Sequence, residues 1–217
     1  MRAARPAVFA AALATLLIAA ALAAAQTING TDGPDRLSGT PGPDLIVGGP
    51  GDDVIRGLAG ADRLNGGGDS DRVFGGAGAD RVFGADCEVG AFGRFCDNPG
   101  REVLRGGPGD DQIRANRCVA TFCARQRYVS LNGGDYAGGA GRDRIIGADG
   151  RERISGGPGP DVLRGGRGAD TLLARDGRRD VVRCGPGRDR ARVDRIDDVR
   201  GCERLSVAGS ARGSGMP

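Results

Sequence analysis

A nine-residue period runs through this chain and limits what it can fold into. From Gly30 to Phe83 six nonapeptides follow one another without a slipped residue, and the third of them reads GGPGDDVIR. Gly opens each unit and usually recurs at the fourth place, Asp holds the sixth place, and an aliphatic residue holds the eighth. A disordered Gly-rich linker is the alternative, but a linker has no physical reason to keep an acid and an aliphatic residue in register.

This period excludes a helical fold and predicts very short strands. Gly is unfavourable inside helices, and the spacing gives no apolar face with a period of 3.6 residues. Places seven to nine alternate outward, inward and outward, whereas the six places before them hold turn residues. If two units complete one turn of a coil, units 18 residues apart stack about 4.8 Å from each other. We therefore predict an all-β fold, a parallel β-roll (β-solenoid) with two lateral insertions.

The chain also divides by composition. Residues 1–25 read as a secretory signal peptide, with Arg2 and Arg5 before an apolar run and small residues at a cleavage site. A retained membrane anchor is the alternative for this segment. The segments expected after it are a first repeat block at 26–86, insertions at 87–137 around one isolated repeat at 106–114, a second block with a C-terminal cap at 138–205, and a disordered tail at 206–217.

The sixth-place acids are the candidate metal ligands. Stacking puts Asp35, Asp53 and Asp71 along one edge of the roll, and the acids of the alternate units along the other. Carboxylates at such spacing repel one another unless a cation lies between them. Carboxylate and Gly-turn carbonyl oxygens together suit calcium better than magnesium, so we expect several Ca²⁺ ions and folding that is coupled to their binding. The candidate ligands are Asp35, Asp44, Asp53, Asp62, Asp71, Asp80, Asp111, Asp143, Glu152, Asp161, Asp170 and Asp189.

Some units depart from the pattern. Glu152 replaces the sixth-place Asp, Asp69 replaces a fourth-place Gly, and one extra residue displaces Asp180. Asp111 has no acid 18 residues away, so it joins a column only if both insertions loop out. We expect the best sites in the regular first block, at the pairs Asp35/Asp53, Asp44/Asp62, Asp53/Asp71 and Asp62/Asp80, and fewer or weaker sites in the second block.

The repeat Gly-Gly-x-Gly-x-Asp-x-aliphatic-x resembles the RTX (haemolysin-type) calcium-binding nonapeptide. The resemblance covers roughly half of the chain. It implies a parallel β-roll in which each calcium lies between turns 18 residues apart, held by sixth-place Asp side chains and Gly-turn carbonyls. This family usually carries a C-terminal secretion signal, so the N-terminal signal expected here resembles that of stand-alone secreted bacterial members.

Six cysteines in an exported chain suggest three disulfides. Pairing of nearest neighbours gives Cys87–Cys96, Cys118–Cys123 and Cys184–Cys202, and the last pair would clamp the cap to the final unit. Six cysteines allow 15 connectivities, so this assignment is a preference. A zinc site is the alternative, but the chain has no His and no C-x-x-C motif.

The sequence predicts no catalytic residues, no enzymatic activity and no cofactor besides calcium. The absence of His removes HExxH proteases and Ser-His-Asp triads. The formal charge is +3, and it falls to about +1 when Arg2 and Arg5 are cleaved off, so there is no basic field for nucleic acid. No membrane span is expected after signal cleavage. The acids left over by the period, Glu88, Asp97, Glu102 and Asp135, are expected in surface loops.

We therefore predict a secreted, extracellular calcium-binding module with a structural or interaction role, with attachment at the cell surface as an option. Two alternatives stay open. One is a calcium-dependent adhesin that binds a surface glycan or protein through its insertion loops. The other is a module related to secreted toxins or polysaccharide-active enzymes, in which Glu88, Glu102 or Asp135 would act.

Overall fold

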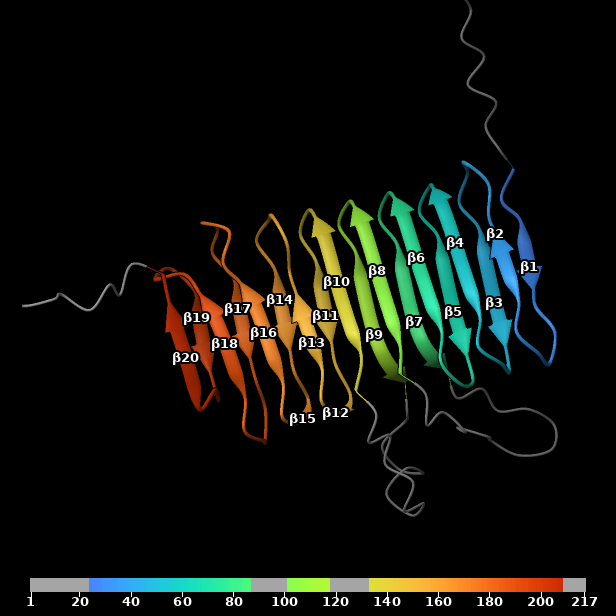
Figure 1. Cartoon of the computed structure of the whole chain (residues 1–217). Coiled ribbons are helices and arrows are strands. Elements are labelled where there is room, and N and C mark those ends of the chain that lie inside the picture. The colour runs from blue at the N-terminus through green and yellow to red at the C-terminus, as the bar shows by residue number, and fades with distance from the viewer. Residues whose placement is uncertain (1–23, 87–100, 118–132, 209–217) are drawn as a thin grey trace, which may run out of the picture.

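Strands of successive repeats alternate between two parallel sheets. The computed structural model describes residues 24–86, 101–117 and 133–208, and these contain strands and turns but no helix. Along the molecule the strands lie side by side in chain order, with the earliest at one end and the latest at the other (Figure 1). The predicted parallel β-roll is confirmed.

Each of the two large sheets has nine strands. The first sheet consists of β1 (Thr27–Asn29), β3 (Leu45–Gly49), β5 (Arg63–Gly67), β7 (Arg81–Asp86), β9 (Gln112–Arg117), β11 (Arg144–Ile146), β14 (Val162–Arg164), β17 (Val181–Arg183) and β19 (Asp198–Arg200). The second consists of β2 (Arg36–Ser38), β4 (Val54–Ala59), β6 (Arg72–Ala77), β8 (Val103–Pro108), β10 (Asp135–Ala140), β13 (Arg153–Ser155), β16 (Thr171–Ala174), β18 (Arg190–Val193) and β20 (Arg204–Val207). A separate short pair joins β12 (Asp149–Gly150) and β15 (Arg167–Gly168).

The register shows how the roll accommodates its irregular segments. Regular turns pair residues 18 apart, as in Ile46 with Leu64. Across the first insertion Val73 pairs with Leu104, and across the second Leu104 pairs with Tyr136. Both sheets therefore continue past the insertions as if these segments were absent. The extra residue near Asp180 is absorbed in the same way, because Leu163 pairs with Val182, 19 residues on.

A narrow core lies between the two sheets. It is built by the eighth-place residues, which alternate with exposed or half-buried neighbours along each strand, as period-two strands require. The buried row consists of Ile46, Ile55, Leu64, Val73, Val82, Leu104, Ile113, Tyr136, Ile145, Ile154, Leu163, Leu172, Val182 and Ala191, all at most 3% exposed. Each turn thus buries about one apolar side chain per sheet.

Several strands extend beyond the predicted three residues. β4 and β6 have six residues each because the Gly-rich start of the next unit continues the ladder, for example where Leu58 pairs with Gly76. β10 begins at Asp135, inside the segment that the sequence assigned to the second insertion, and Tyr136 takes the buried place. β20 reaches Val207, two residues into the segment expected to be a tail.

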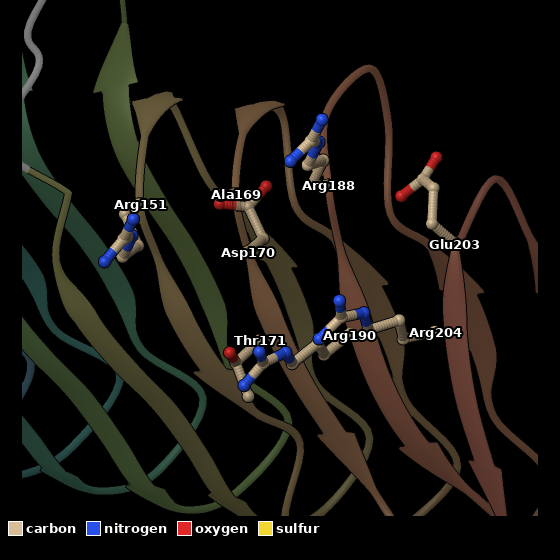
Figure 2. Close-up of a pocket in the computed structure, with 8 residues that line it drawn as sticks. All are labelled: Arg151, Ala169, Asp170, Thr171, Arg188, Arg190, Glu203 and Arg204. Atoms are coloured by element: carbon tan, nitrogen blue, oxygen red, sulfur yellow. The ribbon is translucent and has the colours of Figure 1, made fainter.

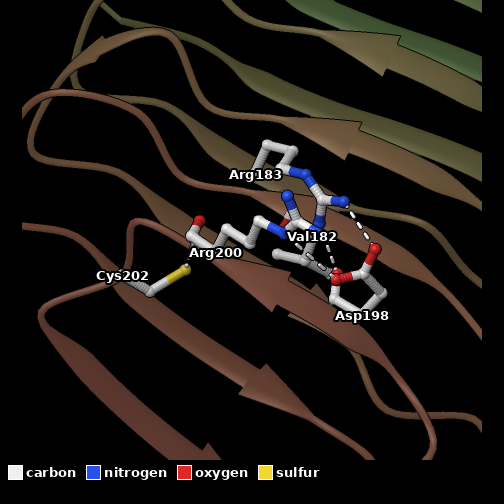
Figure 3. Close-up of polar contacts among 5 residues, drawn as sticks. All are labelled: Val182, Arg183, Asp198, Arg200 and Cys202. Atoms are coloured by element: carbon white, nitrogen blue, oxygen red, sulfur yellow. Dashed lines mark hydrogen bonds and ion pairs between the residues drawn. The ribbon is translucent and has the colours of Figure 1, made fainter.

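The segment predicted as a cap is a further turn of the roll, and it is clamped in place. β19 pairs with β17 and β20 pairs with β18. The predicted Cys184–Cys202 disulfide is present, with a Cα–Cα distance of 5.2 Å. The Arg183 guanidinium donates to the Asp198 carboxylate at 2.6 Å and to the backbone carbonyls of Val182 and Asp198 at 3.0 and 2.6 Å (Figure 3). This hydrogen bond from Arg183 lowers the pKa of Asp198.

Removing the disulfide should loosen this last turn locally. In solenoids each repeat is held by its neighbours, so a terminal repeat can detach without unfolding the rest. A cross-link that closes a loop of 18 residues is expected to contribute about 3 kcal/mol. The double substitution Cys184→Ala and Cys202→Ala should therefore speed amide hydrogen exchange in β19 and β20 and leave exchange in β5 unchanged. Uniform acceleration across the roll would contradict this.

Leu58 and Asp69 are the two non-glycine residues with positive φ among the described residues, at 85° and 71°. Asp tolerates this conformation, and the Asp69 carboxylate accepts a hydrogen bond from the Gly51 N–H at 3.2 Å, so the turn with the replaced Gly keeps its shape. Leu58 has no such compensation, and its side chain is 46% exposed. It occupies a second place that most units fill with Gly, so its backbone is strained.

Leu58→Gly should consequently stabilise the roll by about 1 kcal/mol, because it removes the positive-φ cost and loses little burial. Leu45→Gly is the matched control, since Leu45 is also partly exposed (38%) but has ordinary strand geometry. That change should cost about 0.5–1 kcal/mol. Urea unfolding of both variants beside the wild-type protein measures the difference, and a destabilised Leu58 variant would show that the strain is absent.

Candidate metal sites along two carboxylate columns

The acid that precedes each strand belongs to one of two continuous columns. Column A consists of Asp44, Asp62, Asp80, Asp111, Asp143, Asp161, Asp180 and Asp197, which come before strands of the first sheet. Column B consists of Asp35, Asp53, Asp71, Glu102, Glu152, Asp170, Asp189 and Glu203, which come before strands of the second sheet. The two edges predicted for the first six acids are therefore formed as expected.

One oxygen of most column carboxylates is held by the backbone of the preceding turn. Glu152 is an exception, because both of its carboxylate oxygens are buried without a partner. The N–H of Asp62 donates to Oδ1 of Asp80 at 2.9 Å, and the N–H of Asp143 donates to Oδ1 of Asp161 at 2.9 Å. The same bond spans both insertions, because the Asp80 N–H reaches Asp111 and the Asp111 N–H reaches Asp143. Asp111 thus joins column A in the way that the looped-out insertions would require.

The other oxygen of most column carboxylates has no partner. Within the described ranges Oδ2 is buried without a hydrogen bond in Asp53, Asp62, Asp71, Asp80, Asp111, Asp143, Asp161, Asp170, Asp180 and Asp189. In the eight acids from Asp53 to Asp170 of this list, this oxygen faces the Gly that opens the same unit, whereas the units of Asp180 and Asp189 open with Ala174 and Cys184. A methyl group on Gly48 would collide with Oδ2 of Asp53 and with the carbonyl oxygen of Gly66, one turn on. The missing side chain therefore leaves room in which a carboxylate oxygen and a carbonyl oxygen converge.

In the first two units, Thr supplies donors to the Oδ2 atom that lacks a partner in most later units. The backbone N–H and the hydroxyl of Thr31 both donate to Oδ2 of Asp35, and those of Thr40 donate in the same way to Oδ2 of Asp44. Burial raises the pKa of Asp44, but the bonds from Thr40 and Gln26 outweigh burial and lower it overall. Among the predicted ligands, Asp35 and Asp44 thus have the least need of a cation, and the geometry ranks them behind the units that follow.

Four acids of the columns were not among the predicted ligands. Glu102 was expected in a surface loop but is 5% exposed and precedes β8, because Asp71 and Glu102 occupy equivalent places on either side of the first insertion. Asp180 stays in column A although one extra residue precedes it, since the Asp161 N–H donates to its Oδ1 at 2.8 Å. Asp197 and Glu203 extend the columns by accepting from the N–H groups of Asp180 and Asp189. The apolar residue two places after Glu102, Leu104, was a usable signal.

Column B has one gap. Gly134 occupies the place of an acid between Glu102 and Glu152, which follows from the pairing of β8, β10 and β13. The Tyr136 ring lies against Gly134. Burial, followed by the charges of Glu152 and Glu102, raises the pKa of Tyr136, so its hydroxyl stays neutral. Column B is therefore interrupted at this turn, whereas column A runs from Asp44 to Asp197 without a gap.

Burial makes the column carboxylates hard to ionise in the absence of a cation. It raises the pKa of Asp71 to about 9 and that of Asp111 to about 7, with neighbouring column acids adding to the shift. Asp161 and Asp180 are raised to about 7 for the same reason. Burial, with Asp170 beside it, also raises the pKa of Glu152. Each shift measures the cost of a negative charge at a site that lacks a counterion.

The donor set fits a hard cation. The acids of the two columns offer only oxygen ligands, and calcium takes six to eight oxygen ligands in flexible geometry. Among the described residues, no three Asp, Glu, His or Cys side chains lie close enough together to form a site on their own. Backbone carbonyls such as that of Gly66 would have to supply the remaining ligands, as the Gly-rich turns allow.

The remaining predicted site residues fall outside this arrangement. Cys87, Cys96, Cys118 and Cys123 lie outside the described residues, as do Glu88 and Asp97 and the proposed signal peptide up to residue 23. Asp135 lies on β10, where it forms an ion pair with Arg101 at 2.8 Å. None of the described residues form a helix that is long and apolar enough to cross a bilayer.

Comparison with known proteins agrees with this geometry. A family model described as "RTX calcium-binding nonapeptide repeat (4 copies)" matches residues 29–64, 56–86, 98–118, 132–163 and 146–181. Together these ranges cover more than half of the chain and most of both columns. A search of curated proteins finds no match.

The raised pKa values predict that acid stabilises the roll when divalent cations are removed. An acid whose pKa rises from 3.8 in the unfolded chain to about 7 in the folded chain binds more protons when folded. Its contribution to the stability of the cation-free roll is complete below about pH 4 and is lost as the pH rises towards 7. Thermal melts of the desalted protein should give a falling melting temperature between pH 4 and pH 7.5. A melting temperature that rises over this range would show that the columns are not buried as described.

Proposed function

Because this chain belongs to the RTX calcium-binding nonapeptide repeat family, we propose that it is a secreted module that folds when it binds several Ca²⁺ ions outside the cell. Its role would be structural, or it would present a surface for interaction. The single observation that supports this best is the series of buried Oδ2 atoms that lack partners in both columns. A cation between successive turns would neutralise these oxygens and replace the protons that they otherwise need.

The geometry favours calcium at particular positions along the roll. Between Asp53 and Asp189 the second-place residue is mostly Gly, and Oδ2 is left without a partner, so we place calcium along this part of the roll. The Thr-capped units of Asp35 and Asp44 would bind calcium weakly or not at all. At Gly134 column B would lack a calcium site like those of the other turns, because Gly takes the place of one of the carboxylates there.

Export is supported by two features of the chain. Residues 1–25 have the pattern of a signal peptide. The Cys184–Cys202 disulfide suits an oxidising compartment, and extracellular calcium is abundant enough for weak sites. We extend the proposal to a location outside the cell, with attachment to the cell surface as an option.

We assign no catalytic activity to this module. The chain contains no His, and two of the three acids considered for polysaccharide chemistry have other roles in the structure: Glu102 lies in column B and Asp135 pairs with Arg101. The adhesin alternative keeps more support, because four exposed arginines line a depression on the folded roll.

Asp111→Asn tests the role of a column carboxylate. The amide keeps the shape but removes a buried charge, so the cation-free protein should become more stable at pH 7.5, while calcium should bind more weakly and stabilise less. Calorimetric titration should find about one ion fewer, or affinity at that turn reduced by about tenfold or more. Asp32→Asn is the control, since Asp32 is exposed and belongs to neither column.

Circular dichroism of the wild-type protein with and without chelator accompanies this titration. A calcium-independent β spectrum, or equal behaviour of the Asp111 and Asp32 variants, would overturn the proposed coupling of folding to calcium.

A further inference from the structure

The outer surface of the second sheet carries a depression near its C-terminal end. It spans the starts of β13, β16, β18 and β20 and has a volume of about 590 Å³, within the range of ligand pockets. Ala169 and Thr171 are small residues of its lining, and most of the others have long side chains. Figure 2 shows Arg151 at one end of the depression, with Arg190 and Arg204 extending across the sheet toward Thr171.

Four guanidinium groups line this depression: those of Arg151, Arg188, Arg190 and Arg204. All four side chains are exposed, and none forms an ion pair or a side-chain hydrogen bond within the described part of the chain. Other arginines are engaged by protein groups, for example Arg183 by Asp198. The lining arginines therefore present free, planar donors that match an oxyanion in bidentate fashion.

The two acids of the lining do not cancel this charge. Asp170 is buried, with Oδ1 accepting from the Glu152 N–H, and Oε2 of Glu203 accepts from the Asp189 N–H at 2.7 Å. Four positive groups against two acids leave a net positive site, and a cation in column B beneath it would add to the positive field. The second oxygen of Glu203 and the Thr171 hydroxyl remain as partners for hydroxyl groups.

These groups distinguish among anionic ligands. No aromatic side chain lines the depression, so nucleobases would find nothing on which to stack. Ala169 is the single apolar residue of the lining, which disfavours an acyl chain. A saccharide with a carboxylate and several hydroxyls matches both the guanidinium groups and the Glu203 and Thr171 oxygens. The open outer surface of the sheet also allows the chain to continue on either side.

We propose that this depression binds a carboxylate-bearing saccharide chain. The carboxylate would lie among Arg188, Arg190 and Arg204, and ring hydroxyls would bond Thr171 and Glu203. The site exists only on the folded roll, so it rests on the calcium-dependent folding proposed above and makes saccharide binding depend on calcium indirectly.

Calorimetry with a hyaluronan tetrasaccharide tests this site, using the full chain in calcium at low salt. The double variant Arg190→Ala with Arg204→Ala should weaken binding about tenfold or more, because each substitution removes a charge-assisted contact with the saccharide carboxylate. Arg144→Ala with Arg164→Ala is the matched control, since these arginines are equally exposed on neighbouring strands of the first sheet. The control should bind like the wild-type protein, and the methyl ester of the tetrasaccharide should not bind.

Three outcomes would overturn the proposal: no binding by folded wild-type protein, equal loss in the control variant, or equal binding of a thymidine oligonucleotide of the same charge. Circular dichroism of every variant in calcium is recorded first, and it separates the two proposals. If calcium orders the chain but the tetrasaccharide does not bind, the saccharide site fails alone. If the chain is ordered without calcium and still binds, the folding proposal fails and the saccharide site stands.

Discussion

The second oxygen of the column carboxylates is the constraint on which the rest of this structure depends. A backbone N–H satisfies one oxygen of most of these acids, but the other is buried without a donor over most of the roll. Leaving a buried charge in that condition costs more than any single aliphatic contact in the narrow core contributes. The repeated Gly at the first place follows from the same constraint, because a side chain there would fill the room next to that oxygen.

This arrangement concentrates stability at the boundary between turns. Each Asp takes its N–H donor from the previous turn and faces a carbonyl of the next, so a cation placed there links neighbours and not distant parts of the chain. In a solenoid such nearest-neighbour terms decide how far order propagates. Column A is continuous across both insertions, whereas column B is interrupted at Gly134. We therefore expect column A to carry order from the first block to the second despite the gap in column B.

The sequence was sufficient to predict the features that the nine-residue repeat determines. The two-sheet roll, the inward aliphatic row and the two edges of acids all follow from residues repeating at fixed separations. The Cys184–Cys202 bond followed separately from the pairing of nearest-neighbour cysteines. Two of the failures share a cause, which is that linear spacing does not reveal where extra residues leave the ladder intact. Glu102 and Asp180 join their columns because an insertion and an extra residue leave the ladder intact. The Thr residues that satisfy Asp35 and Asp44 were visible in the sequence, but their donor role depends on turn geometry.

In this fold the acidic and basic side chains of the repeat are neighbours along the chain but point in opposite directions. Acids of the repeat turn inward to the columns, while arginines such as Arg144, Arg153 and Arg190 follow them directly and are exposed on the strands. The small net charge of the sequence therefore conceals two different environments. Cations in the columns would neutralise the inward charges without touching the outward ones. Ion binding would thus make the folded surface more positive at the same time as it orders that surface, so calcium and an anionic partner favour the same state of the chain.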